Sequence, residues 1–228
     1  MPASTPRAAA FFDVDGTLVR TNIVHTYAYF AANQGKPIDS IRKTLGLAAR
    51  IPLFYAAESY NRKTFNDLFY KLYEGISDDR LHVLSEDLFE SVLRPAIYPG
   101  AYSLLDKCRD NGLEPVLLSG SLAVILAPLA DHFDITEMIA NHLEMRDGFA
   151  TGRLTPPVVA GATKAKLIRE YARARGYDLE ECQAYSDSHS DFAMLATVGR
   201  PAAVNPDWRL KGVARAHDWP VLDLSARP

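Results

Sequence analysis

The sequence predicts an α/β protein in which a parallel sheet carries helices on both faces, with an all-helical domain inserted near the N-terminus. Three observations support this fold class. Short apolar runs alternate with stretches of helical periodicity, several runs end in a polar residue and a turn signal, and residues 21–95 contain no convincing strand. Strands that alternate with helices of this length form parallel sheets with helices on both faces.

The first strand is expected in the run AAAFFDV at residues 8–14, after a short N-terminal stretch that looks disordered. A run this short, followed by Asp-Gly, is typical of a buried strand that ends in a loop. Four similar runs predict further strands: EPVLLSG at 114–120, QAYSD at 183–187, RPAAVN at 200–205 and PVLDL at 220–224. Ligands of open α/β sheets bind at the carboxyl ends of such strands.

Two of the connecting segments have clear helical patterns. Apolar residues recur at spacings of three and four in residues 100–112 and again in residues 163–176. The first pattern stops at Gly112 and the second at Gly176, and glycine is the preferred residue just after a helix end. Both segments are therefore predicted to be helices that connect strands.

Residues 21–95 are predicted to form a helical cap domain, inserted between core segments at 1–20 and 96–228. Helical periodicity is clear at 65–75 and 78–93, breaks between helices are expected near 33–37, 50–52 and 74–79, and the apolar stretch at 46–60 is consistent with a buried helix. The insertion holds 11 of the 23 aromatic residues of the chain. These side chains either fill the core of a small helical domain or line a substrate pocket, and the two interpretations are compatible. Because the insertion directly follows the first strand, it is placed to act as a lid over the strand ends.

The composition is that of an ordinary globular protein. Of 228 residues, 48% are hydrophobic and the net charge is −3, which argues against non-specific nucleic-acid binding. Cys108 and Cys182 are too few for a disulfide framework, so we expect reduced thiols in a cytoplasmic protein. The longest apolar run, at 122–130, contains Pro128 and is too short to span a membrane, and the apolar N-terminal stretch is too short for a signal peptide.

Asp13 and Asp15 stand at the end of the first predicted strand, in the stretch FFDVDGT. Residues two apart on a strand point to the same face, so the two carboxylates are expected close together. Like charges this close in a low dielectric need a shared proton or a cation, and hard oxygen ligands suit Mg²⁺. The alternative is that one aspartate only closes the turn before Gly16.

Polar residues also follow other predicted strands. Ser119 comes just after the apolar part of the second strand, and Gly120 and Ser121 are expected to open the next helix. A hydroxyl and helix N–H groups there suit an anion, although a serine at a helix start is often only a cap. Asp187 ends another strand and Asp191 begins the next helix, positions that are also typical of a turn residue and an N-cap. Lys164 lies in the first turn of a helix, where an exposed lysine is usually just solvated and has the wrong sign for the dipole.

Together these residues match the requirements of phosphoryl transfer. Three or four carboxylates suit a divalent cation, a hydroxyl with helix N–H groups suits phosphate oxygens, and one ammonium group can neutralise charge. A carboxylate can also act as the nucleophile, through an acyl phosphate. All of these groups lie at predicted carboxyl ends of strands or in the adjoining loops.

The order and spacing of the motifs resemble the haloacid dehalogenase superfamily of phosphohydrolases, in its phosphoserine-phosphatase-like branch. The stretch DVDGT looks like the first motif of that superfamily, LLSGS like the second, Lys164 like the third and SDSHSD like the fourth. The resemblance spans nearly the whole chain, and four motifs in the same order make it specific. It implies a Rossmann-like core and places the helical cap at 21–95.

The resemblance also implies a role for each matching residue. Asp13 would be the nucleophile, and Asp15 would be the general acid and then the base that activates water. Asp13, the backbone carbonyl of Asp15, and Asp187 would bind Mg²⁺. Asp191 would support the metal through a water or orient Lys164, which would neutralise charge on the phosphoaspartate.

Contacts to phosphate and substrate are implied for the neighbouring residues. Ser119 and the N–H of Gly120 would bind phosphate oxygens. Arg20 borders the first motif and His25 lies just inside the cap, so both are candidates for substrate contact, with an ordinary surface or core role as the alternative. A third candidate is His189, inside the fourth motif.

Several further positions bear on the assignment and on the substrate. Phosphoserine phosphatases carry a glutamate shortly after the first motif that binds the substrate's ammonium group, whereas this chain has Asn22 there. Lys166 is an alternative to Lys164, because the glycine that often follows the lysine is missing. Asn205, after the next strand, is a candidate for lining the site. The segment 21–95 has nine basic and nine acidic residues, so its aromatic residues favour a small or partly apolar phosphomonoester.

The function implied is a Mg²⁺-dependent phosphatase that hydrolyses a small phosphomonoester through a phosphoaspartate on Asp13. Asp15 favours this over dehalogenation, because the dehalogenases of the superfamily lack a carboxylate two residues after the nucleophile. Two alternatives stay open: a phosphotransferase or mutase that uses the same chemistry, and a non-catalytic protein that binds phosphorylated ligands. No stable membrane insertion is expected, and no pattern indicates an oligomeric state.

Overall fold

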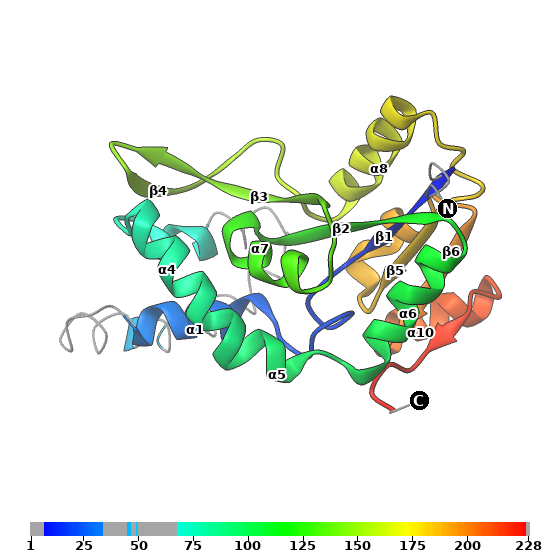
Figure 1. Cartoon of the computed structure of the whole chain (residues 1–228), viewed down its shortest axis with the longest axis horizontal. Coiled ribbons are helices and arrows are strands. Elements are labelled where there is room, and N and C mark those ends of the chain that lie inside the picture. The colour runs from blue at the N-terminus through cyan, green and yellow to red at the C-terminus, as the bar shows by residue number, and fades with distance from the viewer. Residues whose placement is uncertain (1–6, 34–44, 47–48, 50–67, 227–228) are drawn as a thin grey trace.

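A seven-stranded sheet forms the centre of the computed structural model, which describes residues 7–33, 45–46, 49 and 68–226 (Figure 1). The strand order is β4-β3-β2-β1-β5-β6-β7. The strands are β1 (Ala8–Phe12), β2 (Leu113–Leu122), β3 (Glu137–Arg146), β4 (Phe149–Thr155), β5 (Gln183–Ser186), β6 (Arg200–Val204) and β7 (Val221–Leu222). All pairs are parallel except β3 with β4. The parallel sheet and the five predicted strands are therefore confirmed.

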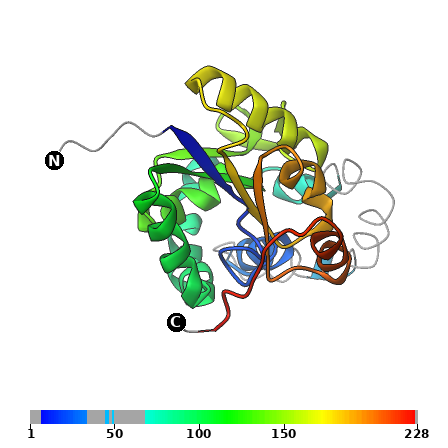
Figure 2. The same cartoon turned by 90° about the vertical axis from the view of Figure 1, so that its right-hand side faces the viewer.

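Helices connect the strands and cover both faces of the sheet (Figures 1 and 2). They are α6 (Pro99–Asp110), α7 (Ala123–His132), α8 (Ala162–Arg175), the 3-10 helix η3 (His189–Asp191), α9 (Phe192–Leu195) and α10 (Trp208–Ala216). The predicted helices at 100–112 and 163–176 are confirmed as α6 and α8. Gly176 ends α8 with φ of 69°, a left-handed conformation that glycine adopts without steric cost.

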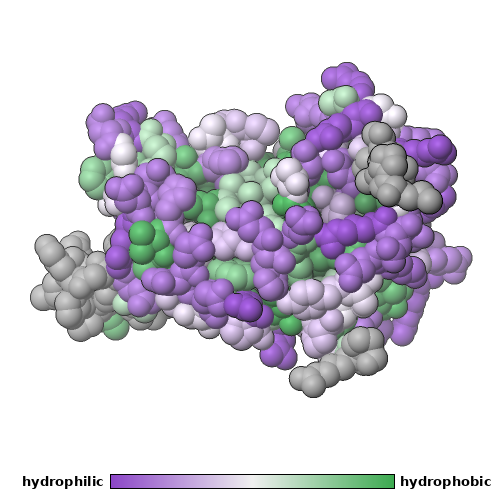
Figure 3. Space-filling model, viewed as in Figure 1, coloured by the Kyte–Doolittle hydropathy of each residue, from purple (hydrophilic) through white to green (hydrophobic). Residues whose placement is uncertain are grey.

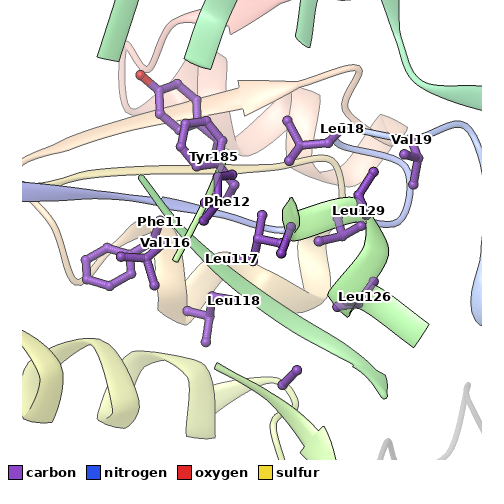
Figure 4. Packing of buried hydrophobic residues seen from close by; sticks show 14 of the residues in the cluster. Phe11, Phe12, Leu18, Val19, Val116, Leu117, Leu118, Leu126, Leu129 and Tyr185 are labelled. Atoms are coloured by element: carbon purple, nitrogen blue, oxygen red, sulfur yellow. The ribbon is translucent and has the colours of Figure 1, made fainter. Parts of the chain in front are cut away.

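Strand β1 shows why the sheet is covered on both sides. All five of its residues are buried, and successive side chains point to opposite faces. The ring of Phe11 meets Tyr171 of α8 edge to face, with ring centroids 5.7 Å apart. Phe12 stacks on Tyr185 of β5, with ring centroids 4.7 Å apart (Figure 4). The hydroxyl of Tyr185 lies 3.5 Å from the sulfur of Cys108 in α6. The two faces of one strand thus pack against elements on opposite sides of the sheet.

The second strand is longer than the sequence indicated. β2 continues through Gly120 and Ser121 and ends at Leu122, with a shift in register against β3 between residues 118 and 122. Helix α7 begins at Ala123. The prediction that Gly120 and Ser121 open this helix is therefore wrong, because the two residues still belong to the extended strand.

The hairpin of β3 and β4 has no counterpart in the predicted strands. Most of its side chains are exposed or half-buried, so neither strand produces an apolar run. The N–H of Gly75 donates to the carbonyl of Ala150, and the N–H of Ala150 donates to the carbonyl of Ile76, each at 2.8 Å. The hairpin therefore joins the end of the sheet to the segment inserted after β1.

The described part of residues 21–95 is helical. It contains α1 (Ile23–Ala32), η1 (Lys71–Tyr73), α4 (Asp78–Leu88) and the π-helical η2 (Phe89–Leu93), and α5 (Arg94–Ala96) follows. The predicted helix at 78–93 is confirmed as α4 and η2. The predicted helix at 65–75 is described only from residue 68, and it is helical from there to Tyr73. The expected breaks at 33–37 and 50–52 and the apolar stretch at 46–60 fall largely outside the described residues, and the cap boundaries stay a prediction.

Aromatic side chains form the core of this inserted segment. Tyr27 and Phe30 of α1 pack against Phe69, Tyr70 and Tyr73, with ring centroids 4.9–6.2 Å apart and mostly edge to face. All five rings are fully buried. The aromatic richness of the segment thus serves packing in the described residues, the first of the two interpretations of the sequence.

The remaining general expectations concern thiols and the surface. Cys108 and Cys182 are both free and buried, as predicted. Among the helices that the structure describes, none is long and apolar enough to cross a bilayer. The face shown in Figure 3 is mostly hydrophilic, with apolar residues visible between polar ones, as on an ordinary globular surface.

Candidate active site

The candidate residues meet at the carboxyl ends of three neighbouring strands. Asp13 directly follows β1, Asp187 directly follows β5, and Ser119 lies near the carboxyl end of β2. Phe12 pairs with residue 117 of β2 and with Tyr185 of β5, so β1 and β5 end at nearly the same level, and Ser119 lies two residues beyond that level on the longer strand β2. The backbone N–H of Asp13 donates to the carbonyl of Tyr185 at 2.9 Å, which fixes the nucleophile candidate beside β5.

A buried ion triplet lies at the centre of the site. The Lys164 ammonium donates to Asp13 Oδ1 at 2.7 Å and to Asp191 Oδ2 at 2.6 Å, and all three residues are buried. Burial lowers the pKa of Lys164, but the two carboxylates outweigh it and hold the pKa above its usual value. Burial raises the pKa of Asp13 to about 6, against the opposing charge of Lys164. Lys164, which is distant in sequence, thus supplies part of the positive charge that the carboxylate of Asp13 requires.

Asp187 shares its surroundings with Asp13. The hydroxyl of Thr17 is 3.3 Å from Asp13 Oδ2 and 3.4 Å from Asp187 Oδ1, so the two carboxylates flank one small group. Burial, with the charges of Asp13 and Asp191 adding, raises the pKa of Asp187 to about 8. In the described residues no cationic side chain forms an ion pair with Asp187. The pair of Asp13 and Asp187 therefore has a deficit of positive charge.

Gly16 leaves room for the Asp187 carboxylate. Its φ is 83°, and a Cβ at this position would lie 2.1 Å from Asp187 Oδ2. Within the described residues no three side chains of metal-ligating type stand together, so a cation here would take two carboxylates and complete its shell with backbone oxygens and water. Mg²⁺ is commonly bound by one or two carboxylates in this way, so the donor set fits that ion.

Asp15 is separated from this cluster by its own hydrogen bonds. Its Oδ2 accepts from the hydroxyl of Ser121 at 2.6 Å, and its Oδ1 accepts from the hydroxyl of Thr21 at 3.0 Å. Asp13 and Asp15 therefore have different partners in this structure rather than a proton shared between them. The Asp15 carboxylate thus lies beside the buried cluster with hydroxyl partners of its own.

The end of β2 after Ser119 is held from several sides. The N–H of Ser121 donates to Ser119 Oγ at 3.1 Å, and within the described residues no group accepts the hydroxyl proton of Ser119. The carbonyl of Gly120 accepts from the hydroxyl of Tyr70 at 2.5 Å and from the side-chain amide of Asn141 at 2.7 Å. Asn141 also accepts from the N–H of Val159 at 2.8 Å. The end of β2 is thus hydrogen-bonded to the inserted segment, and through Asn141 to the segment that leads into α8.

The candidates in the first part of the inserted segment lie outside the hydrogen-bonded cluster. Arg20 and His25 are exposed, and no contact of either side chain with Asp13, Asp15 or Lys164 is present in the described residues. Asn22 is the N-cap of α1, where its side-chain oxygen accepts from the backbone N–H groups of residues 24 and 25 at 3.0 Å. A helix cap explains an asparagine at this position.

The other candidates also have structural partners. His189 is exposed and stacks on Phe192 with ring centroids 6.2 Å apart. Asn205 Oδ1 accepts from the N–H of Leu224 at 3.0 Å, which fastens the C-terminal segment. Lys166 is exposed and pairs with Glu170 at 3.7 Å, whereas Lys164 enters the site.

Sequence reasoning missed the hydroxyls and amides that hold the main groups. Ser121 was detectable, because a strand that continues past Ser119 puts residues two apart on one face. Thr17, Tyr70 and Asn141 had no such signal, since their positions depend on which segments meet in space.

Comparisons with known proteins agree with this geometry. Residues 10–196 match the model of the haloacid dehalogenase-like hydrolases. The "inhibition of morphological differentiation protein" of Streptomyces azureus is 34% identical over 224 residues, which cover 97% of this chain and 80% of that protein. Phosphoserine phosphatase SerB1 of Mycobacterium tuberculosis is 32% identical over 95% of this chain and 71% of its own length. Histidinol-phosphatase of Neisseria meningitidis is 28% identical over 94% of this chain and 98% of its own.

Solved structures show the same fold. A protein of unknown function from Bordetella pertussis superposes with a TM-score of 0.82 at 26% identity, over 96% of this chain and all of that one. A phosphoserine phosphatase in its apo form superposes with a TM-score of 0.70 at 17% identity, over 97% of this chain and 94% of that one. The resemblance predicted from the motifs is confirmed: this chain belongs to the haloacid dehalogenase-like hydrolase family.

Proposed function

We propose that the protein is a Mg²⁺-dependent phosphatase that hydrolyses a small phosphomonoester through a phosphoaspartate on Asp13. One observation supports this most directly. A buried carboxylate at a strand end is paired with Lys164 on one side, and Asp187 lies on the other side with no cationic partner in the part of the chain that the structure describes. Such a group is ionised, fixed and flanked by positive charge when a divalent cation is bound, as nucleophilic attack on a phosphoryl group requires.

In the first half-reaction a carboxylate oxygen of Asp13 attacks phosphorus and the bond between phosphorus and the ester oxygen breaks. Asp15, in its acid form, gives its proton to the leaving oxygen, so an alcohol departs. Ser119 and the N–H of Gly120 bind phosphate oxygens, and the ammonium of Lys164 offsets their charge. The hydroxyl proton of Ser119, which no group of the described residues accepts, fits this role.

In the second half-reaction the carboxylate of Asp15 takes a proton from water while the water oxygen attacks phosphorus. The bond between phosphorus and Asp13 breaks, inorganic phosphate leaves, and Asp13 is a carboxylate again. Asp191 holds Lys164 in place through both steps, because its Oδ2 also accepts from the buried hydroxyl of Ser186 at 2.9 Å.

The cation site of the proposal consists of Asp13, Asp187 and the backbone carbonyl of Asp15. When bound there, Mg²⁺ supplies positive charge to the phosphate oxygens and lowers the repulsion between them and the attacking carboxylate. The raised pKa of Asp187, about 8, and the space left by Gly16 support a cation at this position.

The substrate class follows from the names of the relatives and from the inserted segment. One relative is named for phosphoserine and another for histidinol phosphate, both small phosphomonoesters with an amino group. In this chain Asn22 caps a helix and brings no negative charge for an ammonium group. We propose that the substrate is a small phosphomonoester whose binding does not depend on contact between an ammonium group and Asn22.

The test is phosphate release with Mg²⁺ from a panel of phosphomonoesters: phosphoserine, histidinol phosphate, sugar phosphates, phosphocholine and a lysophosphatidate. The proposal expects turnover that disappears with EDTA and with Asp13→Asn. Asp110→Asn, at an exposed position at the end of α6, is the matched control and keeps activity. Acid quenching during turnover of a radiolabelled substrate should trap label on the wild-type protein and none on Asp13→Asn.

The same assay decides between the proposal and its alternatives. Transfer of the label to an added sugar or alcohol, with little free phosphate, would favour a phosphotransferase. Binding of phosphate esters without turnover would overturn the enzyme proposal, and activity that survives in Asp13→Asn would overturn the nucleophile assignment.

A further inference from the structure

Both carboxylate oxygens of Asp15 accept a hydroxyl, which within the described residues is true of no other carboxylate of the candidate site. Ser121 comes from the end of β2 and is 2% exposed, while Thr21 comes from the loop that leads into α1. The shorter of the two bonds, 2.6 Å, is the one from Ser121. A hydroxyl bond to an ionised acceptor is about twice as strong as one between neutral groups.

Ser121 is held by its own contacts, so its hydroxyl can fix the orientation of the Asp15 side chain. Its N–H donates to Ser119 Oγ at 3.1 Å, and both serines belong to β2, where residues two apart point to the same face. Asp15 lies in a loop beyond β1, where a free aspartate side chain can rotate about two torsions. The Ser121 hydroxyl selects one of those orientations and links the acid to the serine proposed to bind phosphate.

We propose that Ser121 is a positioning residue for the general acid, which holds the Asp15 carboxyl towards the leaving oxygen and stabilises the carboxylate as its proton departs. This inference rests on the proposed function, because it assumes that Asp15 protonates the leaving group. The proton moves from Asp15 to the ester oxygen while the phosphorus–oxygen bond breaks, and the Ser121 proton stays on its own oxygen. The hydroxyl bond strengthens as negative charge appears on Asp15, so it favours the transition state over the ground state.

The test compares leaving groups in Ser121→Ala. An alkyl phosphate needs a proton on its departing oxygen, whereas dinitrophenyl phosphate releases a stable phenolate without one. The parameter to measure is kcat/KM, because it covers steps only up to release of the alcohol and excludes hydrolysis of the phosphoaspartate. General acid catalysis contributes about 10²–10⁴-fold, so we expect misplacing the acid to cost about tenfold or more on the alkyl phosphate. The loss on dinitrophenyl phosphate should stay below about twofold, since that reaction does not use the acid.

The matched control is Ser85→Ala, which also removes a buried hydroxyl, one that donates to the carbonyl of Leu81 at 2.7 Å within α4. It should leave both kcat/KM values unchanged. Equal losses of Ser121→Ala on both substrates would mean a general structural role and would overturn the inference, as would no loss on either. If Ser121→Ala does not fold by circular dichroism, Thr21→Val removes the hydroxyl from the other oxygen of Asp15 and must show the same selective loss.

The two proposals fail in different ways. A wild-type protein that turns over neither substrate overturns the proposed function and this inference with it. If the wild-type protein is active and Ser121→Ala lowers kcat/KM equally for both substrates, only the role of Ser121 is overturned.

Discussion

Replacing Lys164 by methionine tests how the site tolerates its own negative charge. The ammonium lies 2.7 Å from Asp13 and 2.6 Å from Asp191, and the three residues are 4%, 7% and 4% exposed. Methionine keeps an unbranched apolar stem but leaves the two carboxylates without their partner. Breaking a buried ion pair costs about 3–5 kcal/mol, whereas an exposed pair is worth about 0–1 kcal/mol. We therefore expect the free energy of unfolding to fall by about 3–5 kcal/mol near neutral pH in the absence of metal.

The loss should shrink as the pH falls. Burial raises the pKa of Asp13 to about 6 even with Lys164 opposing it, so this carboxyl binds more protons in the folded chain than in the unfolded one. Such a group destabilises the fold increasingly as the pH rises from the unfolded value towards the folded one. Without Lys164 the folded pKa moves higher still, and a proton takes the place of the ammonium at low pH. The deficit of the variant is thus expected to be larger at about pH 8 than at about pH 5.

Urea unfolding followed by circular dichroism, in EDTA and over this pH range, measures the effect. Lys166→Met is the matched control, because Lys166 is exposed and its pair with Glu170 spans 3.7 Å. The free energy of unfolding of this control should fall by less than about 1 kcal/mol at every pH. If Lys164→Met lost no more free energy of unfolding than this control, or if its loss did not depend on pH, the buried ion triplet would not stabilise the fold.

Three further outcomes are expected. Gly16→Ala should abolish Mg²⁺-dependent phosphate release and weaken Mg²⁺ binding in calorimetry, because its Cβ would lie 2.1 Å from Asp187 Oδ2; unchanged binding would contradict the cation site. Added Mg²⁺ should raise the Tm more at about pH 8 than at about pH 6. The pKa values of Asp187 and Asp13 are raised to about 8 and about 6, so protons compete with the cation at the lower pH. Equal shifts of the Tm at the two pH values would speak against both carboxylates as ligands. Tyr70→Phe removes the 2.5 Å bond to the Gly120 carbonyl and should lower the free energy of unfolding by about 1 kcal/mol in urea titration, with no change as the contrary result.

Much of the core fold could be predicted from the sequence, because buried parallel strands leave continuous apolar runs. The same runs located Asp13, Ser119 and Asp187, since each stands at or near the end of one run. Lys164 was harder, because a lysine in the first turn of a helix is ordinarily solvated. Only its place in the order of motifs distinguished it from Lys166, and the structure shows the physical difference, a buried pair against an exposed one.

Other parts of the structure had no local signal. The β3–β4 hairpin is half-exposed, so its polar and apolar residues do not mark it as a strand pair. The partners of Asp15 are one residue six positions away and another 106 positions away, and only the paired strands bring the second one near. Asn141 and Tyr70 converge on the Gly120 carbonyl from different segments for the same reason. Pairing of strands and docking of the inserted segment, rather than local pattern, decide these contacts.

The charges at the strand ends explain why a divalent cation suits this site better than a second lysine would. Asp13 and Asp191 pair with the ammonium of Lys164, and Asp187 lies beside them without an ion pair in the described residues, so the cluster carries an excess of negative charge when all three carboxyl groups are ionised. The raised pKa of Asp187 means that the metal-free site relieves this excess by taking up protons. A bound divalent cation would neutralise it instead and would leave Asp13 ionised as a nucleophile. A fixed second lysine would hold Asp13 in a permanent ion pair, whereas a cation with water ligands can exchange them for phosphate oxygens. The excess of negative charge that destabilises the metal-free fold is therefore the same feature that would give the site its affinity for a metal ion and, through that ion, for phosphate.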